Sequence, residues 1–294
     1  MKVSIIAEGG AMRGAYVAGA LKALYEYHGL KSVDVATGSS AGIADLAYYL
    51  TGQIHDAYKV WTKYLTKPIF LSVKHAINHF PIVDIDYLVD IVFKKKVILN
   101  TRKLKKLKTK FIIPLTNANT GKTEYFTNKT NFDFFKVLKA ALAVPFFYGK
   151  KVRVGKKEYY DGGVSDPLPL NIPELKNTRK IIILTHPKKE RALFMIACSL
   201  LGTIKRICIP LFGESLCKKI KESDKLHLKQ EKQIERLEKQ QNVIIRPKKE
   251  LLRLNNSSKN IRQSIDEGYN DTVNNNKLIE LIKELNKNRP ELFC

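Results

Sequence analysis

The sequence predicts an α/β fold of three layers, α/β/α, in which helices cover both faces of a mainly parallel sheet. Two observations lead to this prediction. Short apolar runs alternate with helical patterns at the start of the chain, and later runs at residues 111–117 and 181–185 are apolar enough to be buried strands. The 294 residues are 44% hydrophobic, so the chain can bury a large core and is not of the disordered class.

Two strand-helix units open the chain. Residues 3–7 form an apolar run that ends at a glycine pair, and residues 14–28 then place apolar side chains at helical spacing. Residues 33–37 are the next expected strand, and a turn of small residues at 38–42 leads into a second helix. The expected order is therefore strand, helix, strand, helix.

The middle of the chain is expected to add helices and two hairpins. Residues 53–100 have a mixed, mainly helical character. The later elements should follow in the order strand, strand, helix, strand, strand, strand, at residues 111–117, 122–127, 132–143, 152–154, 158–160 and 181–185.

The character of the sequence shifts after residue 190. An interrupted apolar helix, a charged helix over residues 214–240, a short strand at 243–246 and terminal helices are expected there. No flexible linker precedes them. We therefore expect a catalytic core over residues 1–190 and a helical C-terminal extension over residues 191–294 that packs on it.

The pattern Gly-x-Ser-x-Gly occurs at residues 38–42, between a predicted strand and a predicted helix. Gly38 and Gly42 allow a sharp turn that lifts the hydroxyl of Ser40 clear of the sheet edge, and the following helix directs its positive end at the reacting centre. This is the setting of a nucleophilic serine. A serine that only caps the helix is the other interpretation.

A second glycine-rich turn follows the first expected strand, with the sequence Gly9-Gly10-Ala11-Met12-Arg13-Gly14. A right-handed crossover would place this loop beside Ser40 at the same edge of the sheet. The bare main-chain N–H groups of this loop could then bind the oxyanion that forms when Ser40 attacks a carbonyl group. In this interpretation, Arg13 and Gly14 support the loop.

The same loop admits a rival interpretation as a dinucleotide-binding fingerprint. Asp34 lies about 20 residues beyond the loop, as the acidic residue of that motif does. However, Ala11 stands at the third glycine position and Asp34 lies inside its strand rather than at the end. The fingerprint also leaves Ser40 without a role, so we disfavour it.

A serine nucleophile needs a base that accepts its proton, and the sequence offers two candidates. Asp161 ends an expected strand, and His186 ends the last strand of the core. The order Ser40, Asp161, His186 formally fits an α/β-hydrolase triad, although only one full strand-helix unit precedes Ser40, where that fold has several strands. Because an exposed aspartate is a poor base, Asp161 would need partial burial to raise its pKa.

Together, these motifs resemble the patatin-like phospholipase family, and its bacterial branch most closely. The resemblance rests on the two glycine-containing turns, on Ala143-Val144-Pro145, and on Asp161-Gly162-Gly163 followed by Asp166-Pro167. It extends in order and spacing over about residues 4–190, and the tail is similar at Ile245-Arg246-Pro247 and Gly268-Tyr269. The family usually has glycine where this chain has Ala11.

The resemblance implies a patatin-like fold and a lipid acyl hydrolase of the phospholipase A or lysophospholipase type. It implies a Ser-Asp dyad of Ser40 and Asp161, with Gly9, Gly10 and Ala11 as the oxyanion hole. We expect neither a metal ion nor another cofactor, because the sequence has no Asp-rich loop with calcium-ligand spacing. Two alternatives stay open: a Ser-Asp-His esterase, and a non-catalytic membrane-binding module in which Ala11 has spoiled the oxyanion hole.

The chain is strongly basic, with 52 Lys and Arg against 28 Asp and Glu and a formal net charge of +24 at pH 7. Residues 94–110 carry many of these cations and no acid, so this segment should attract a polyanion. A phospholipid or other lipid ester is the expected substrate, and peripheral association with an anionic membrane is one interpretation of the charge. A solvated lysine-rich face is the other. No nucleic acid is expected, because no reader motif is present.

The sequence shows few signs of export. The four cysteines lie in the last third without a CxxC pair, which argues against a disulfide framework and against a zinc site. The N-terminal apolar run is too short for a signal peptide, and the longest apolar stretch, at residues 192–201, is too short to span a bilayer. We expect a cytoplasmic protein, with peripheral attachment to a membrane as an option.

Overall fold

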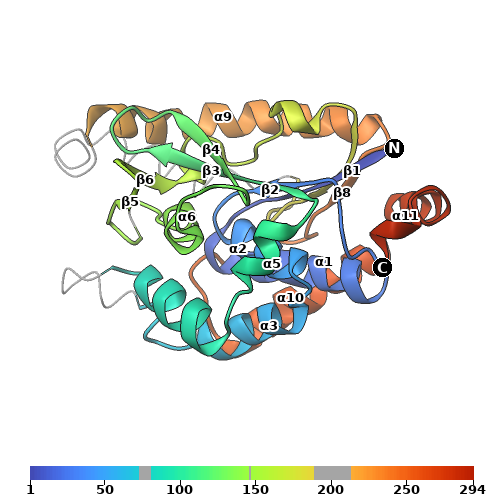
Figure 1. Ribbon diagram of the computed structural model, residues 1–294, viewed down its shortest axis with the longest axis horizontal. Helices are drawn as coiled ribbons and strands as arrows, with labels where there is room; N and C mark the ends of the chain where they lie inside the picture. The colour runs from blue at the N-terminus through green and yellow to red at the C-terminus, as the bar shows by residue number, and fades with distance from the viewer. Residues whose placement is uncertain (73–80, 146, 189–212) are drawn as a thin grey trace.

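The computed structural model describes residues 1–72, 81–145, 147–188 and 213–294. In these residues eight strands form one sheet in the order β5-β6-β3-β2-β1-β7-β8, and β4 pairs with β3 outside this path. The strands are β1 (Lys2–Ala7), β2 (Val35–Gly38), β3 (Lys110–Asn117), β4 (Thr123–Thr127), β5 (Val152–Val154), β6 (Lys157–Asp161), β7 (Thr178–Ile183) and β8 (Val243–Ile245). Helices lie on both faces of the sheet (Figure 1), so the predicted fold class is confirmed.

The helices follow the predicted order in most places. The α-helices in the described residues are α1 (Gly14–Glu26), α2 (Ala41–Leu50), α3 (Ile54–Lys59), α5 (Thr101–Lys106), α6 (Phe134–Ala141), α9 (Glu214–Lys239), α10 (Ser258–Val273) and α11 (Asn276–Asn288). The segments η2 (Val60–Tyr64) and η3 (Tyr87–Lys96) are π-helical. Single 3-10 turns are η1 (Ala11–Arg13), η4 (Gly162–Val164), η5 (Pro173–Leu175) and η6 (Pro290–Leu292). The apolar helix expected after residue 190 lies outside the described residues.

The centre of the sheet is parallel and one end of it is antiparallel. β1 pairs in parallel with β2 and β7, β2 pairs in parallel with β3, and β7 with β8. The two predicted hairpins appear as the antiparallel pairs β3–β4 and β5–β6, and β6 also pairs antiparallel with β3. This pairing places Asp161, the last residue of β6, opposite Leu115 of β3.

The two faces of the sheet pack against different helices because side chains alternate along each strand. In β1, Val3 and Ile5 belong to the larger core with α1 and α2, whereas Ile6 belongs to a second core that includes Ile234 of α9. In Figure 1, α9 lies along one face of the sheet, with α1, α2 and α10 on the other. Helices therefore cover the sheet on both faces.

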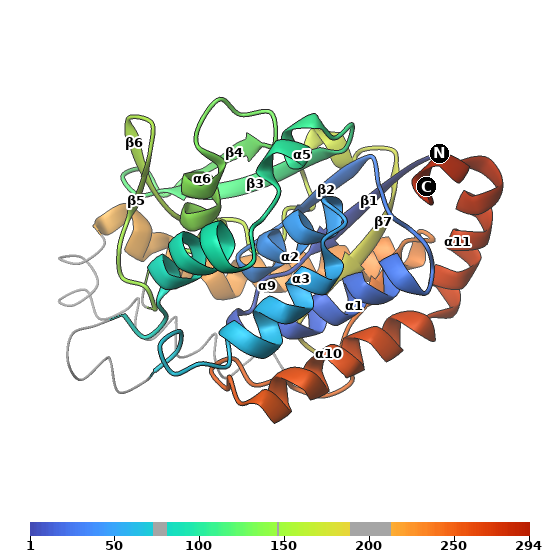
Figure 2. The same cartoon turned by 60° about the horizontal axis from the view of Figure 1, so that its bottom comes forward.

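The C-terminal part of the chain is built into the same sheet and core. β8 extends the sheet beyond β7, and α10 packs along α1 (Figure 2). Glycines allow this close contact: a Cβ at Gly19 would lie 2.0 Å from the carbonyl oxygen of Ile265, and one at Gly268 would lie 2.1 Å from that of Tyr16. Any larger residue at either position would push α1 and α10 apart.

Two further features concern the expected location of the protein. In the described ranges, no helix combines the length and the apolar character that crossing a bilayer requires. Cys217 on α9 is disulfide-bonded, and Cys294 is a free, exposed thiol. The sequence predicted no disulfide framework, and no cysteine motif in it indicates the bond of Cys217.

Candidate active site

The ends of β1 and β2 bring two turns together. In the parallel register Ala7 lies opposite Gly38, so the chain leaves both strands at the same edge of the sheet. A Cβ at Gly38 would lie 2.1 Å from the carbonyl oxygen of Ala7, which only glycine avoids. The glycine loop and the turn that carries Ser40 consequently start side by side.

Ser40 occupies a strained backbone conformation at the start of α2. Its φ is 49° and its ψ is −130°, a region that residues with a side chain rarely adopt, at a cost of about 1–3 kcal/mol. Gly42 makes the turn possible, because a Cβ there would lie 2.6 Å from the carbonyl oxygen of Ala7. This geometry is typical of a serine held out for reaction.

The glycine loop lies directly against this turn. A Cβ at Gly9 would lie 2.6 Å from the Cβ of Ser40, so the loop approaches the serine as closely as main chain allows. The amide of Gly9 donates to Ser39 Oγ over 3.1 Å and already has a partner. In the described residues, the amides of Gly10 and Ala11 make no hydrogen bond, which leaves these two donors for a ligand.

Arg13 and Gly14 hold the other end of the loop. Arg13 is buried, and its Nε would lie 3.0 Å from a Cβ at Gly10. A Cβ at Gly14 would lie 2.7 Å from that of Ala41, so this glycine lets the start of α1 approach the start of α2. The loop is therefore clamped between two helix starts.

Asp161 is the last residue of β6 and is 2% exposed. Burial raises the pKa of its carboxyl group to about 7, against smaller opposing effects of the Ser40 side chain and the Gly163 N–H. Oδ1 accepts the Gly163 N–H over 2.7 Å. Oδ2 is buried without a hydrogen-bond partner in the described residues. Ser40, which lowers the pKa of this carboxyl group and therefore lies near it, thus makes no hydrogen bond with it that meets the usual limits of distance and angle. Such bonds often tighten only when substrate binds.

Ser39 joins the loops that carry these residues. Its hydroxyl accepts the amide hydrogen of Gly9 and donates to the carbonyl oxygen of Pro167 over 2.6 Å. The main chain of Asp161 is fixed in a similar way, since its N–H donates to the carbonyl oxygen of Ala143 over 3.0 Å. One small side chain thus connects the glycine loop, the serine turn and the segment after Asp161.

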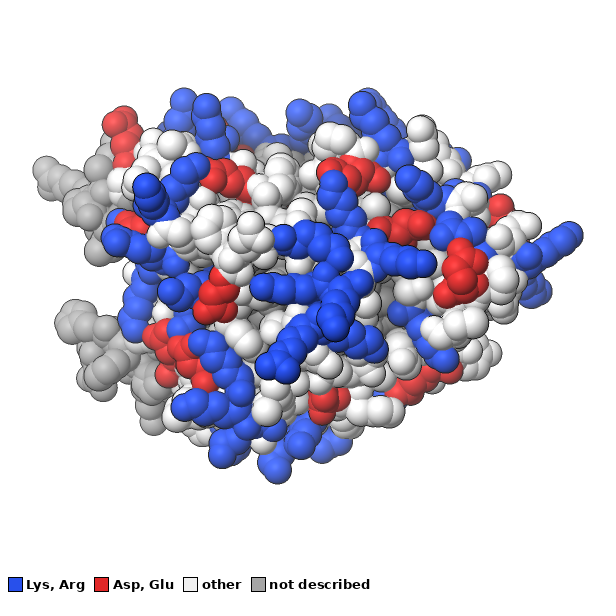
Figure 3. Space-filling model, viewed as in Figure 1, with Lys and Arg blue, Asp and Glu red and all other residues white. Residues whose placement is uncertain are grey.

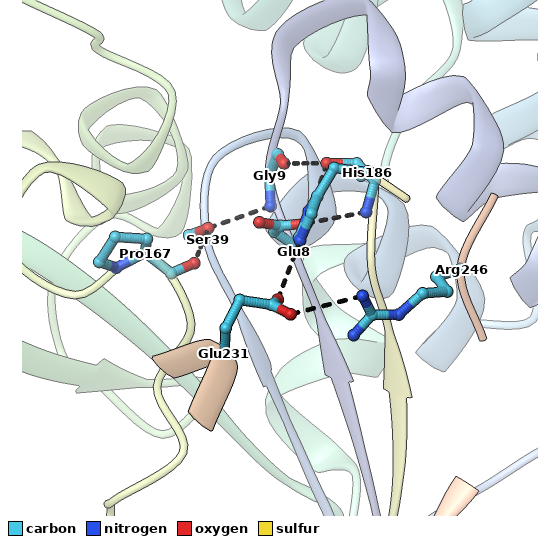
Figure 4. Close-up of polar contacts among 8 residues, drawn as sticks. Glu8, Gly9, Ser39, Pro167, His186, Glu231 and Arg246 are labelled. Carbon is cyan, nitrogen blue, oxygen red and sulfur yellow. Dashed lines mark hydrogen bonds and ion pairs between the residues drawn. The ribbon is translucent and has the colours of Figure 1, made fainter. Parts of the chain in front are cut away.

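His186 lies in a buried network of charges at the end of β7 (Figure 4). It is 2% exposed, with Nδ1 2.7 Å from Glu8 Oε2 and Nε2 3.1 Å from Glu231 Oε1. Arg246 lies 3.5 Å from the other oxygen of Glu231. Both ring nitrogens of His186 therefore face carboxylates.

Glu8 connects this network to the glycine loop. Its Oε2 accepts the main-chain N–H of Thr185 over 2.7 Å and lies 3.0 Å from the Thr185 hydroxyl. The same hydroxyl lies 2.8 Å from the carbonyl oxygen of Gly9. The position of the loop is thus fixed from β7 as well as from Ser39.

An apolar pocket adjoins Ser40 and runs along α2. Its lining includes Ser40, Ala11, Met12, Trp61, Leu88 and Leu142. Apart from Ser40 the walls near the serine are almost entirely hydrocarbon, which suits the acyl part of a lipid. In the described residues, no group of three or more His, Cys, Asp or Glu side chains is placed to hold a metal ion.

Comparison with known proteins identifies the family. The family model described as "Patatin-like phospholipase" matches residues 5–173, which is more than half of the chain. The protein belongs to this family. The predicted resemblance is therefore confirmed, and the matched range contains Ser40, Asp161 and the whole glycine loop.

Two individual proteins are similar to this chain. The uncharacterized protein YjjU of Escherichia coli K12 is 24% identical over 186 residues, which are 62% of this chain and 51% of YjjU; the chain thus matches about half the length of that relative. The crystal structure of VipD from Legionella pneumophila aligns with a TM-score of 0.52 and 13% identity, over 96% of this chain and 67% of VipD. This second likeness concerns the fold.

Several residues of the site were not predicted from the sequence. Ser39 stands at a variable position of the serine motif, and Glu8 precedes the glycine pair, so neither carries a signal of its own. Thr185 follows a strand without any motif. Their roles depend on contacts between residues that are far apart in the chain, such as the 177 positions between Glu8 and Thr185.

Ala11 gives a first testable prediction. Its φ is 51°, a left-handed conformation that costs a residue with a Cβ about 1–2 kcal/mol. Ala11→Gly should remove this strain but add freedom to the unfolded chain, so we expect a net stabilisation of about 0.5–1 kcal/mol in urea unfolding. Turnover should not fall, because the amide stays in place.

Asn177→Gly is the matched control for this substitution. Asn177 also has a positive φ, of 58°, but asparagine tolerates that region better than alanine does. Its replacement should therefore stabilise the protein less than Ala11→Gly. A lower free energy of unfolding for Ala11→Gly than for the wild type would show that Ala11 is not strained.

Proposed function

We propose that this patatin-like phospholipase is a serine hydrolase of lipid acyl esters, which uses Ser40 as nucleophile and Asp161 as base. The proposal is carried by one arrangement: Ser40, in a strained conformation, lies near the buried carboxyl group of Asp161, whose pKa is about 7. Ser40 also lines an apolar pocket. A carboxylate with this pKa is a far better base near neutral pH than an ordinary aspartate.

In the first half of the reaction, Ser40 Oγ attacks the ester carbonyl carbon while its proton passes to Asp161. The amides of Gly10 and Ala11 stabilise the resulting oxyanion, each donor contributing about 3 kcal/mol. When the tetrahedral intermediate collapses, the C–O bond to the alcohol breaks and the alcohol oxygen takes the proton from Asp161. An acyl ester on Ser40 remains.

In the second half, Asp161 takes a proton from a water molecule as its oxygen attacks the acyl-enzyme. The same two amides stabilise the second oxyanion. Collapse breaks the bond to Ser40 Oγ, the serine recovers its proton from Asp161, and the fatty acid leaves. Asp161 thus moves one proton in each half and ends as it began.

The surroundings of His186 favour Asp161 as the base over a Ser-Asp-His triad. Its nitrogens lie within hydrogen-bonding distance of Glu8 and Glu231, and a triad histidine needs one nitrogen directed at the serine. The contacts of Asp161 are different, since one carboxylate oxygen has no partner in the described residues. We therefore assign His186 to the support of the glycine loop.

Labelling with a fluorophosphonate probe tests the proposal. The probe forms a covalent adduct only with an activated serine, so we expect one adduct, on Ser40 by peptide mass spectrometry, and none in Ser40→Ala. Hydrolysis of lysophospholipid by the wild type and not by this variant should accompany it. A folded wild type that takes no label and cleaves no ester would instead favour the non-catalytic membrane-binding module.

Phospholipid or lysophospholipid is the proposed substrate class, and the basic surface supports its presentation by a membrane. Figure 3 shows lysine and arginine side chains over much of one face, with a cluster over α5. Arg102, Lys103, Lys105 and Lys106 of this helix are exposed, and the nearby Ile98 is 62% exposed. Clustered cations next to an apolar side chain suit an anionic lipid surface.

Salt should weaken this association. We expect hydrolysis in vesicles that contain anionic lipid to fall several-fold between about 50 and 500 mM NaCl, because salt screens the attraction between separated charges. Hydrolysis of a short, soluble ester should change little over the same range. Sedimentation of the protein with the vesicles measures the binding step separately.

Two double variants test which part of the surface binds the anionic vesicles. Lys105→Gln with Lys106→Gln should weaken vesicle binding, whereas Lys283→Gln with Lys287→Gln on α11 removes the same charge elsewhere and should weaken it less. Equal losses in the two double variants would mean that only net charge matters. A flat response to salt would exclude electrostatic attachment.

A further inference from the structure

The pocket beside Ser40 follows one side of α2. The pocket is lined by Ser40, which caps α2, and by four residues of α2, Ala41, Ala44, Asp45 and Tyr48. Their spacing places them on one face of the helix. Asp45 is five residues beyond Ser40, which corresponds to about 7.5 Å along the helix axis. An acyl chain that runs along α2 from the serine would therefore pass Asp45.

Asp45 is an unusual residue for the wall of a mainly apolar pocket. It is 4% exposed, and its neighbours in the lining include Leu88, Val83 and Phe70. Its Oδ1 accepts the indole N–H of Trp61 over 2.7 Å, but its Oδ2 is buried without a hydrogen-bond partner in the part of the chain that the structure describes. A buried polar atom left in this way costs about 1–3 kcal/mol.

The protonation state of Asp45 decides what it could bind. Burial raises the pKa of its carboxyl group to about 8, against a smaller opposing effect of the Trp61 N–H. At pH 7 the group is therefore mostly the neutral acid, which can both donate and accept a hydrogen bond through the oxygen that Trp61 does not use. Asp45 lines the pocket and its carboxyl group turns easily about the Cβ–Cγ bond, so this oxygen can meet a ligand there.

We propose that Asp45 forms a polar subsite in the acyl pocket, and that the protein prefers acyl chains that carry a hydroxyl group at the depth of Asp45. The inference rests on the proposed function for the placement of the ester at Ser40. A hydroxyl group there satisfies the second carboxyl oxygen, whereas a plain chain leaves it unpaired. The hydrogen bond from Trp61 accounts for the burial of Oδ1 of Asp45 but not for that of Oδ2.

Fluorescence of Trp61 gives a test that does not depend on turnover. Trp61 is the single tryptophan of the chain, lines the pocket and is hydrogen-bonded to Asp45. The wild type is titrated with decanoic acid and with hydroxydecanoic acids that carry the hydroxyl group at successive carbons. We expect one or two positions in the series to bind about tenfold more tightly than decanoic acid.

Variants of Asp45 assign the preference to this residue. Asp45→Asn keeps the bond from Trp61 and a polar group at the second position, so part of the preference should remain. Asp45→Leu should abolish it. Val83→Ala is the matched control: it changes the volume of the same pocket without changing its polarity, and should shift the affinities of plain and hydroxylated acids together.

The outcomes separate this inference from the proposed function. If no hydroxydecanoic acid binds more tightly than decanoic acid, or if Asp45→Leu keeps the preference, the polar subsite does not exist. Should Asp45→Leu fail to fold, the wild-type series and Asp45→Asn still decide. The nitrophenyl esters of the same acids complete the test: a binding preference without hydrolysis would refute the proposed function alone, and hydrolysis without any preference would refute this inference alone.

Discussion

Asp161→Asn should lower the turnover of a soluble ester by about 10³–10⁴-fold while the protein stays folded, because the amide cannot accept the proton of Ser40. The substitution keeps the size of the side chain, and its oxygen can still accept the Gly163 N–H that now binds Oδ1. The Michaelis constant should change little. Labelling by a fluorophosphonate should slow by a similar factor, since that reaction needs the same proton transfer.

The pH dependence of turnover should follow the same group. The pKa of Asp161 is raised from its ordinary value of 3.8 to about 7, and only the ionised form is a base. Turnover of the wild type should therefore fall tenfold for each pH unit below about 7 and level off above it. Asp161→Asn should lack this step in its residual activity.

Turnover should rise with pH up to about 7, whereas the contribution of Asp161 to the free energy of unfolding should fall over the same range. Because the folded-state pKa of Asp161 is raised, the folded protein keeps a proton between about pH 4 and pH 7 that the unfolded chain has already released. This group therefore favours folding at low pH and loses that contribution as the pH rises to about 7. In urea unfolding, Asp161→Asn should gain stability relative to the wild type from pH 4 to pH 8.

His186→Gln is the control for a general loss of order at the site. Glutamine cannot reach both carboxylates, so the support of the glycine loop should weaken and turnover should fall about tenfold. The step in turnover near pH 7 should remain. A folded His186→Gln protein that loses as much activity as expected for Asp161→Asn, with Asp161→Asn itself nearly unaffected, would make His186 the base and overturn the dyad.

The sequence was informative wherever a local pattern determines local structure. The apolar run before Gly9 and the turn around Ser40 predicted two strands and their connections, and chain topology then predicted that both turns share one edge. The hairpin partners of β3 and β5 were predicted from turn residues between apolar runs. The shared edge appears in the structure as the parallel register that places Ala7 opposite Gly38.

Contacts between distant residues could not be predicted in this way. Glu8 and His186 are 178 positions apart, and a glutamate before a glycine pair looks like an ordinary polar residue. The sequence gives no sign of which way Asp45 faces on its apolar helix, and only the pocket shows that it faces inward. The hydrogen bond from the Gly9 amide to Ser39 could not be predicted either, and it leaves Gly10 and Ala11 as the proposed oxyanion donors.

Gly9→Ala should be the most damaging single substitution in the glycine loop. The new Cβ would lie 2.6 Å from the Cβ of Ser40 and 2.9 Å from the carbonyl oxygen of Ser39, so either the loop or the serine turn must move. A displacement of about 1 Å at a reacting centre costs on the order of 10²-fold in rate. Because oxyanion contacts exist only in the transition state, the turnover number should fall and the Michaelis constant should not.

Gly19→Ala separates misplacement of the loop from loss of stability. Its Cβ would meet the carbonyl oxygen of Ile265 at 2.0 Å, an even closer clash, but at the contact of α1 with α10. We expect Gly19→Ala to lower the melting temperature more than Gly9→Ala does, and to leave the turnover number per folded molecule close to that of the wild type. If both variants lose turnover only in proportion to their unfolded fraction, the glycine loop does not position the reacting groups, and the oxyanion hole must be sought elsewhere.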